Sequence, residues 1–220
     1  MKNFEYYAPT RVIFGRDTHK QVGEIIKGYG LGRVFLHYGG GSIKKSGLYD
    51  AVVQSLTDNG IAYAELGGVQ PNPTLSFARK GIEICREFGA DLVLAVGGGS
   101  AIDSAKVVAV GSKNEGDPWR FSMKEDTPKA ALPVATILTI AATGSEMSAS
   151  AVITNEELGL KRGYNSPFHR PLFSILNPEL TYTLPPYQTA CGVVDIIYRS
   201  SVYDPDLHFG DLGHIRWSGI

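Results

Sequence analysis

The sequence predicts an α/β fold, a doubly wound and mostly parallel sheet. Short apolar segments alternate with segments whose apolar residues recur every three or four positions, and this alternation of strand and helix patterns runs through residue 137. The segment 92–96 is apolar throughout, as expected of a central parallel strand that is buried on both faces. Such an order is typical of strands joined by crossover helices that cover both faces of one sheet.

The elements follow one another in a regular order. Strands are expected at 11–14, 33–37, 61–66, 92–96 and 132–137. Helices are expected at 22–29, 48–58 and 74–88, with Thr74 as a candidate cap, and from a glycine triplet at 97–99 to about residue 110. The polar stretch 111–129 is expected to be a loop.

After residue 137 the pattern changes. Strands are expected at 149–154 and 172–176, separated by a turn-rich stretch, and Pro185 and Pro186 start a helical segment. The last residues, 201–220, follow neither period and are expected to be irregular. The predicted organisation is therefore an α/β domain over 1–184, the start of a helical domain over 185–200 and a divergent tail over 201–220.

Composition excludes several classes of function. The 220 residues are 43% apolar and 20% charged with a net charge of −1, which is ordinary globular composition. Basic residues form no stripe, so we expect no nucleic-acid partner. No apolar segment is long enough to span a bilayer, and the first residues carry no export signal, so we expect no membrane association. Two cysteines fit a reducing, cytoplasmic compartment.

The cysteines and three histidines are expected to be structural. Cys85 falls on the apolar face of a predicted helix and is expected in the core, whereas Cys191 is expected to pack at a helix start. The side chains expected at the surface or partly buried, rather than as ligands, are His19, His37 and His169.

The second glycine triplet is the first functional signal. Gly97, Gly98 and Gly99, followed by Ser100, join the strand at 92–96 to a helix. Without Cβ atoms the backbone can approach a ligand closely, and the first turn of the helix offers free N–H donors and a partial positive charge. This combination binds diphosphate groups. The alternative is a tight strand-to-helix turn with Ser100 as the N-cap.

The first triplet ends the strand at 33–37. In a nucleotide-binding sheet an acidic residue at this position accepts a hydrogen bond from the 2′-hydroxyl of the adenosine ribose. Here Gly39, Gly40 and Ser42 leave room for a 2′-phosphate instead, with Lys44 and Lys45 nearby. The alternative is a flexible surface turn.

A third loop, 139–146, follows a strand and carries small and hydroxylated residues. Thr139 and Thr143 could donate hydrogen bonds to a cofactor that lies against the loop. An ordinary polar loop is the alternative interpretation.

Two motifs in this order, GGGSxxDxAK at 97–106 and TxxxTGSE at 139–146, resemble the iron-containing (group III) alcohol dehydrogenase family, within it the butanol dehydrogenase-like branch. Further segments that match the family are 7–15, 39–42, 71–73, 177–181 and 189–195. The resemblance implies an N-terminal domain that binds NADP or NAD, an all-helical second domain, and iron or zinc between them. The reaction implied is hydride transfer between the nicotinamide and a small primary alcohol or aldehyde.

The resemblance also implies roles for single residues. The turn Gly97, Gly98, Gly99 and Ser100 would hold the diphosphate, and Gly39, Gly40 and Ser42 would lie at the adenosine ribose. The residues expected to line the rest of the dinucleotide site are Asn72, Asp103, Thr139, Thr143 and Lys161.

The sequence departs from the family at the metal site. The family holds its metal with one Asp and three His; Asp195 matches the Asp, but Arg199 stands where the first His is expected. A guanidinium is cationic and cannot coordinate a metal. The other two His would fall beyond Ile220, so a truncated chain with a divergent C-terminus and no intact catalytic residues is expected.

Three functions follow from these observations. The first is an NAD(P)-dependent alcohol dehydrogenase by descent that binds the dinucleotide. The second is a non-catalytic dinucleotide-binding fragment, and the third is an enzyme similar to glycerol-1-phosphate or dehydroquinate synthases. Assembly into a homo-oligomer is left open.

Overall fold

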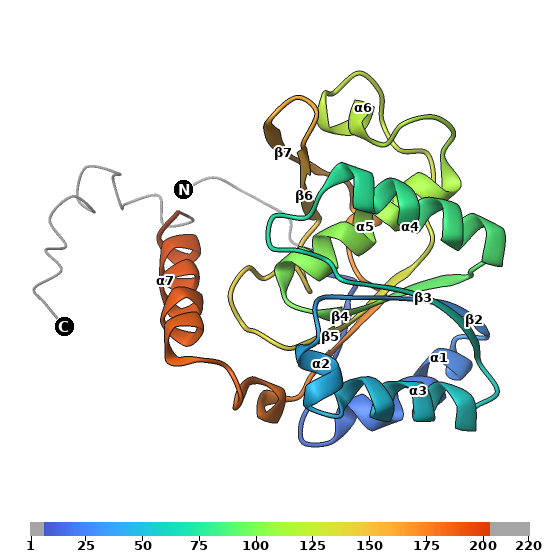
Figure 1. Cartoon of the computed structure of the whole chain (residues 1–220), viewed down its shortest axis with the longest axis vertical. Helices are drawn as coiled ribbons and strands as arrows, with labels where there is room; N and C mark the ends of the chain where they lie inside the picture. Colours follow the sequence, from blue (N-terminus) through green and yellow to red (C-terminus); the bar gives the residue numbers. More distant parts are fainter. Residues whose placement is uncertain (1–6, 203–220) are drawn as a thin grey trace, which may run out of the picture.

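The computed structural model describes residues 7–202, with side chains through Ile197. Its centre is a six-stranded parallel sheet in the order β1-β8-β5-β4-β2-β3, with a separate antiparallel hairpin, β6–β7 (Figure 1). The strands are β1 (Arg11–Phe14), β2 (Arg33–Tyr38), β3 (Ala62–Gly67), β4 (Leu92–Gly97), β5 (Val134–Leu138), β6 (Ser150–Asn155), β7 (Leu160–Asn165) and β8 (Phe173–Leu176).

Helices cover both faces of the sheet. The helices are α1 (Val22–Gly28), α2 (Ser42–Lys45), α3 (Leu48–Asp58), α4 (Leu75–Phe88), α5 (Gly99–Lys113), α6 (Trp119–Ser122) and α7 (Pro186–Val202), with 3-10 turns at Thr18–Gln21, Pro167–His169 and Pro178–Thr181. Figure 1 shows α1 and α3 on one face of the sheet and α4 and α5 on the other. The doubly wound, mostly parallel fold class is therefore confirmed.

The central strand β4 explains how one chain makes two cores. Leu92, Leu94 and Val96 belong to the core under α1 and α3, whereas Val93 and Ala95 belong to the core under α4 and α5. Successive side chains of a strand point to opposite faces, so a strand that is covered twice must be apolar at every position. This is the reason for the uninterrupted apolar segment.

The winding of the chain creates a switch point between β2 and β4. From β2 the chain moves outward to β3, then crosses back over β2 to β4. The helices that follow β2 and β4, α3 and α5, lie on opposite faces of the sheet, so the loops after these two strands diverge at their carboxyl ends. Gly39 and Gly97 meet there: a Cβ on Gly97 would lie 3.8 Å from the Gly39 nitrogen.

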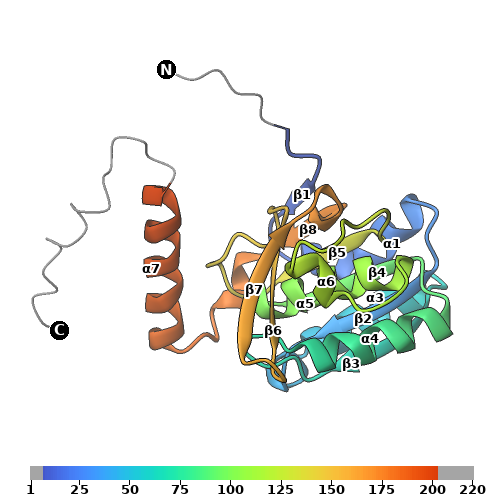
Figure 2. The ribbon, with the colours of Figure 1, turned by 90° about the horizontal axis from the view of Figure 1, so that it is seen from above.

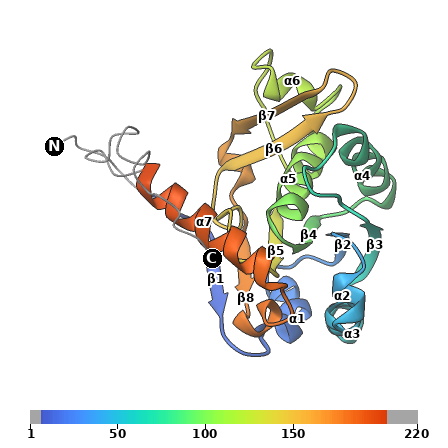
Figure 3. The same ribbon diagram turned by 60° about the vertical axis from the view of Figure 1, so that its left-hand side comes forward.

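The hairpin β6–β7 corrects the prediction of a turn-rich stretch between two strands. β7 was missed because its residues, LKRGYN, are mostly exposed and show no apolar alternation. The hairpin packs against α5 and α4 (Figure 3). Its attachment to α4 includes hydrogen bonds from the Thr154 amide to the Pro73 carbonyl, 2.8 Å, and from Arg79 to Glu157, 2.9 Å.

The predicted loop 111–129 is also partly wrong. α5 continues to Lys113, and the short helix α6 follows, with Trp119 and Phe121 buried. Two aromatic residues in a polar stretch do not form a helical pattern of apolar positions, so the helix was not predicted. Burial of their side chains holds it in place.

α7 begins at the predicted Pro185–Pro186 boundary, and Figure 2 shows it standing away from the sheet. It extends to Val202, two residues further than expected; the remainder of the predicted irregular tail, 203–220, lies outside the described residues. Its exposed apolar side chains are Val193, Val194, Ile196 and Ile197. Gly192 approaches the 139–146 loop closely, because a Cβ there would lie 2.7 Å from the Ala141 carbonyl oxygen. None of the described helices is long and apolar enough to cross a membrane.

The histidines and one cysteine correct the sequence predictions. His19, His37 and His169 are all buried rather than at the surface. A neutral imidazole with a hydrogen-bond partner is tolerated inside a protein, and His37 lies 2.9 Å from the Ser104 hydroxyl. Cys85 is buried as predicted, whereas Cys191 is exposed because α7 projects from the sheet.

Candidate functional site

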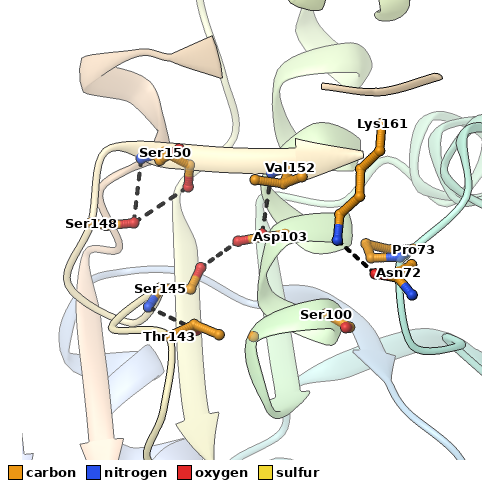
Figure 4. Close-up of a pocket in the computed structure, with 11 residues that line it drawn as sticks. Asn72, Pro73, Ser100, Asp103, Thr143, Ser145, Ser148, Ser150, Val152 and Lys161 are labelled. Atoms are coloured by element: carbon orange, nitrogen blue, oxygen red, sulfur yellow. Dashed lines mark hydrogen bonds between the residues drawn. The ribbon is translucent and has the colours of Figure 1, made fainter. Parts of the chain in front are cut away.

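A cavity of about 310 Å³ opens beside the start of α5. Its walls come from α5, the 143–150 segment, the β6–β7 hairpin and the turn before α4 (Figure 4). The predicted site residues that line it are Asn72, Gly99, Ser100, Asp103, Thr143 and Lys161. Most of the side chains that line the cavity are polar, which suits a polar or charged ligand.

The start of α5 offers free amides to this cavity. The helix begins at Gly99 with Gly98 as its N-cap, so the alternative in which Ser100 caps the helix is wrong. The Ile102 amide makes the bond to the Gly98 carbonyl at 3.1 Å, and the amides of Gly99 and Ser100 precede it in the first turn, where helices leave N–H groups without intrahelical acceptors. With the positive end of the helix dipole, these amides favour an anion.

The glycine turn is required by the loop that lies on it. A Cβ on Gly98 would come within 2.4 Å of the Ile140 side chain, and one on Gly99 within 2.4 Å of the Thr143 hydroxyl. Such contacts are far below van der Waals distance, so any larger residue would displace the 139–146 loop. The glycines therefore bring the Thr143 side chain and the start of α5 to the same cavity.

Asp103 holds one wall of the cavity together. Its carboxylate accepts hydrogen bonds from the Ser145 hydroxyl at 2.5 Å and from the Val152 amide at 3.1 Å (Figure 4). The Ser145 amide in turn donates to the Thr143 hydroxyl oxygen at 3.2 Å. A charged acceptor on α5 thus fixes both the loop and the first strand of the hairpin.

Lys161 and Asn72 face each other at the exposed side of the cavity. Lys161 on β7 donates a 2.6 Å hydrogen bond to the Asn72 side-chain oxygen (Figure 4). Asn72 has a φ of +57°, a left-handed conformation that asparagine tolerates better than most residues. The ammonium adds positive charge beside the free amides of α5.

A second cavity of about 250 Å³ lies beside α2. It takes in two predicted site residues, Ser42 and Thr139, together with apolar side chains that include Ile43, Leu180 and Leu184. The predicted residues Gly39, Gly40, Gly97 and Gly98 line neither cavity. They form the turns after β2 and β4, and the Thr139 amide is tied to that edge by a 3.1 Å bond to the Gly97 carbonyl.

Three serines of the first cavity were not predicted from the sequence. Ser145, Ser148 and Ser150 all line it. The available signal was that Ser145 is the serine of the TGSE motif and that Ser148 and Ser150 follow it closely, but serines in a polar stretch are common. Lys106, the last residue of the GGGSxxDxAK motif, does not line the cavity but is fully buried beneath it.

The described residues do not fit a closed metal site. No group of three or more His, Cys, Asp or Glu side chains able to hold an ion occurs between residues 7 and 197. Asp195, the position that resembles a metal ligand, lies on α7 and is partly exposed. A protein site for iron or zinc needs about three or four protein ligands.

Fold and cavity define a class of protein: an open α/β sheet with a cavity beside the carboxyl ends of its strands, the place where sheets of this kind bind ligands. Comparison then gives the family. The model of the family described as iron-containing alcohol dehydrogenase matches residues 9–178, and the chain belongs to that family.

Individual relatives agree with this family. The chain is 49% identical to the probable NADH-dependent butanol dehydrogenase 1 of Bacillus subtilis, over 94% of this chain and 53% of that protein. It is 39% identical to the NADPH-dependent aldehyde reductase YqhD of Escherichia coli, over 89% of this chain and 50% of that protein. The crystal structure of NADH-dependent butanol dehydrogenase A from Thermotoga maritima superposes with a TM-score of 0.89 at 46% identity, covering 90% of this chain and 50% of that chain. The chain thus spans about half the length of these relatives.

Proposed function

We propose that this chain binds a nicotinamide dinucleotide and belongs to the NAD(P)-dependent oxidoreductases that interconvert small primary alcohols and aldehydes. The observation that carries the proposal is the convergence of α5 amides, the Thr143 hydroxyl and the Lys161 ammonium on one cavity. The family match favours an alcohol dehydrogenase over the synthase-like alternative.

The two cavities suggest which part of the dinucleotide each would bind. The diphosphate would accept hydrogen bonds from the amides of Gly99 and Ser100, and Lys161 would neutralise part of its charge. Leu180 and Ile43 beside Ser42 offer an apolar setting for the adenine ring. The bound nicotinamide would supply hydride chemistry, while the chain's own groups bind and orient it.

Calorimetry of the chain with NADH and with NADPH tests this proposal. We expect saturable binding with one site per chain for at least one of the two dinucleotides. ADP-ribose, which keeps the diphosphate but lacks the nicotinamide, should bind more weakly at the same site. The absence of saturable binding of both dinucleotides to chain that is folded by circular dichroism would overturn the proposal.

We propose that the chain binds NADPH at least as tightly as it binds NADH. A Cβ on Gly39 would have its nearest neighbour, the Val69 carbonyl oxygen, 3.9 Å away, and one on Gly40 would have none within 4 Å. The turn 39–42 therefore has space for a 2′-phosphate, and none of its own residues carries a carboxylate that would repel it. Lys44 is exposed on the next turn and adds positive charge.

A non-catalytic dinucleotide-binding role is the second candidate. It is favoured by the lack of a metal-ligand cluster among residues 7–197. Metal analysis after dialysis against iron and zinc, combined with an assay on butanol and butyraldehyde, separates the two candidates. Substoichiometric metal and background turnover would support the second candidate. Stoichiometric metal that is lost in Asp195→Ala, with metal-dependent turnover, would support the enzyme.

A further inference from the structure

Lys106 is a fully buried cation in the middle of α5. Its ammonium lies within hydrogen-bond distance of five oxygens from three serines. The contacts are Ser145 O at 2.7 Å, Ser145 Oγ at 2.9 Å, Ser148 O at 3.1 Å, Ser148 Oγ at 3.3 Å and Ser150 O at 2.8 Å. An ammonium has three N–H donors, so these oxygens share them.

The three serines are the same residues that form the missed wall of the first cavity. Ser145 and Ser148 belong to the segment without regular structure between β5 and β6, where the chain turns from the sheet to the hairpin, and Ser150 is the first residue of β6. Three backbone carbonyl oxygens that converge on one point repel each other unless a cation lies between them. Lys106 provides that cation from a rigid helix.

We propose that Lys106 is a positioning residue of the dinucleotide site, which holds the 145–150 wall of the cavity onto α5 through its ammonium. The inference rests on the proposed function for the identity of the ligand. Lys106 acts from behind the wall, because it does not itself line the cavity. Ser145 joins this contact to Asp103, since its hydroxyl donates to that carboxylate.

The charge needed for this role is present at neutral pH. Burial lowers the pKa of Lys106 to about 8, and the carboxylates of Asp103 and Glu146 oppose that decrease, whereas Arg170 adds to it. The side chain is therefore still mostly protonated at pH 7. The free-energy cost of removing the ammonium from water is offset by its hydrogen bonds to the serine oxygens.

The test compares Lys106→Met, which keeps the stem and removes the charge, with Lys106→Arg, which keeps a cation. Lys113→Met is the matched control, because Lys113 lies on the same helix and is exposed. Three quantities are measured for each: the Kd for NADH, the guanidinium midpoint of unfolding, and hydrogen-exchange protection of 145–150 relative to β4.

We expect Lys106→Met to raise the Kd by about tenfold, which equals about 1.4 kcal/mol, and to lower protection of 145–150 while β4 stays protected. Lys106→Arg should recover most of the affinity, and Lys113→Met should match the wild type. A purely structural role would lower the midpoint of Lys106→Met and leave the Kd of the folded fraction unchanged, and that result would overturn the proposal.

Two further readouts keep the outcome decisive. If Lys106→Met does not fold, Ser145→Ala takes its place, because it removes a hydroxyl oxygen that the Lys106 ammonium contacts. An unchanged Kd in Ser145→Ala would count against the proposal. If the wild type binds neither dinucleotide, the proposed function fails by itself. Hydrogen exchange then still decides whether Lys106 holds the wall, since unchanged protection in a folded Lys106→Met or Ser145→Ala variant would reject it.

Discussion

Lys161 and Asn72 are 89 residues apart in the chain, yet a 2.6 Å hydrogen bond joins them across the side of the first cavity. The bond links the β6–β7 hairpin to the turn before α4, two segments that the parallel sheet alone does not connect. Both side chains are exposed, so the contact can be exchanged for a contact with a ligand.

The first prediction concerns this lysine. Lys161→Met should weaken binding of NADH and NADPH by about tenfold, because a charge-assisted contact to an anionic ligand is lost. Folding stability should be nearly unchanged, since the side chain is exposed. Calorimetry measures the affinity. Arg162→Met, the exposed neighbour on the same strand, is the control, and an equal effect in both variants would indicate only a general charge effect.

Gly99 gives a prediction about packing. Gly99→Ala should displace Thr143, because the added Cβ would lie 2.4 Å from its hydroxyl oxygen. We expect a loss of about 1–3 kcal/mol in the free energy of unfolding, together with a weaker affinity for NAD(P)H. Gly28→Ala is the control, since its Cβ would have nothing within 4 Å. Unfolding in guanidinium measures the stability of both variants, and equal midpoints for Gly99→Ala and Gly28→Ala would contradict the prediction.

Gly39 gives a prediction about the choice between dinucleotides. Gly39→Asp should move the preference toward NADH by about tenfold or more, because a carboxylate at the end of β2 accepts the ribose hydroxyl and repels a 2′-phosphate. Gly39→Asn, uncharged and similar in size, is the matched control. The ratio of the two Kd values is the measurement. A wild type that already prefers NADH by about tenfold, equal to about 1.4 kcal/mol, would reject the prediction.

Buried histidines make stability depend on pH. Burial lowers the pKa of His37 to about 4 and that of His169 to about 3, from an ordinary value of 6.5. In this range the unfolded chain binds protons that the folded chain does not. The stabilising contribution is therefore complete above pH 6.5 and is lost as the pH falls towards 4 and then 3.

The midpoint of guanidinium unfolding should accordingly fall between pH 6.5 and 4.5. A shift from 6.5 to about 4 corresponds to roughly 3 kcal/mol for His37. His37→Gln keeps a donor near Ser104 but does not titrate, so its midpoint should fall less steeply. An identical slope in the variant and the wild type would show that His37 is not responsible.

The exposed face of α7 predicts self-association. Val193, Val194, Ile196 and Ile197 are each at least 43% exposed on this helix, and such an apolar patch favours contact with another surface. Light scattering after size exclusion should show a mass that grows with concentration. Val193→Ser with Ile197→Ser should reduce it, whereas Leu158→Ser, an exposed apolar residue at the hairpin turn, should not. A wild type that stays monomeric at all concentrations would contradict the prediction.

The core elements could be predicted because their residues have only one suitable environment. β4 is apolar at every position since it is buried on both faces, and the glycines after it are required where the Ile140 and Thr143 side chains come close. Local pattern therefore predicts the parallel sheet and the helix that follows the glycine turn.

The hairpin and the buried cation could not be predicted in the same way. β7 is mostly exposed, and the hairpin is held by contacts such as that of Arg79 with Glu157, which are 78 residues apart. Lys106 gives a similar signal in a sequence whether it contacts a ligand or the protein interior. Its role depends on where the 145–150 segment lies, which only the tertiary structure determines.

The position of β1 has a consequence for how the chain acquires its structure. β1 lies at the edge of the sheet, and its partner β8 begins at Phe173, about 160 residues later. The first strand of the sheet to be synthesised must therefore wait for nearly the whole α/β domain before it can form its backbone hydrogen bonds. Contacts between residues so far apart are slow to form. On the ribosome, the β2–β3–β4 region should collapse first, and edge closure by β1 should be the last and slowest event of folding.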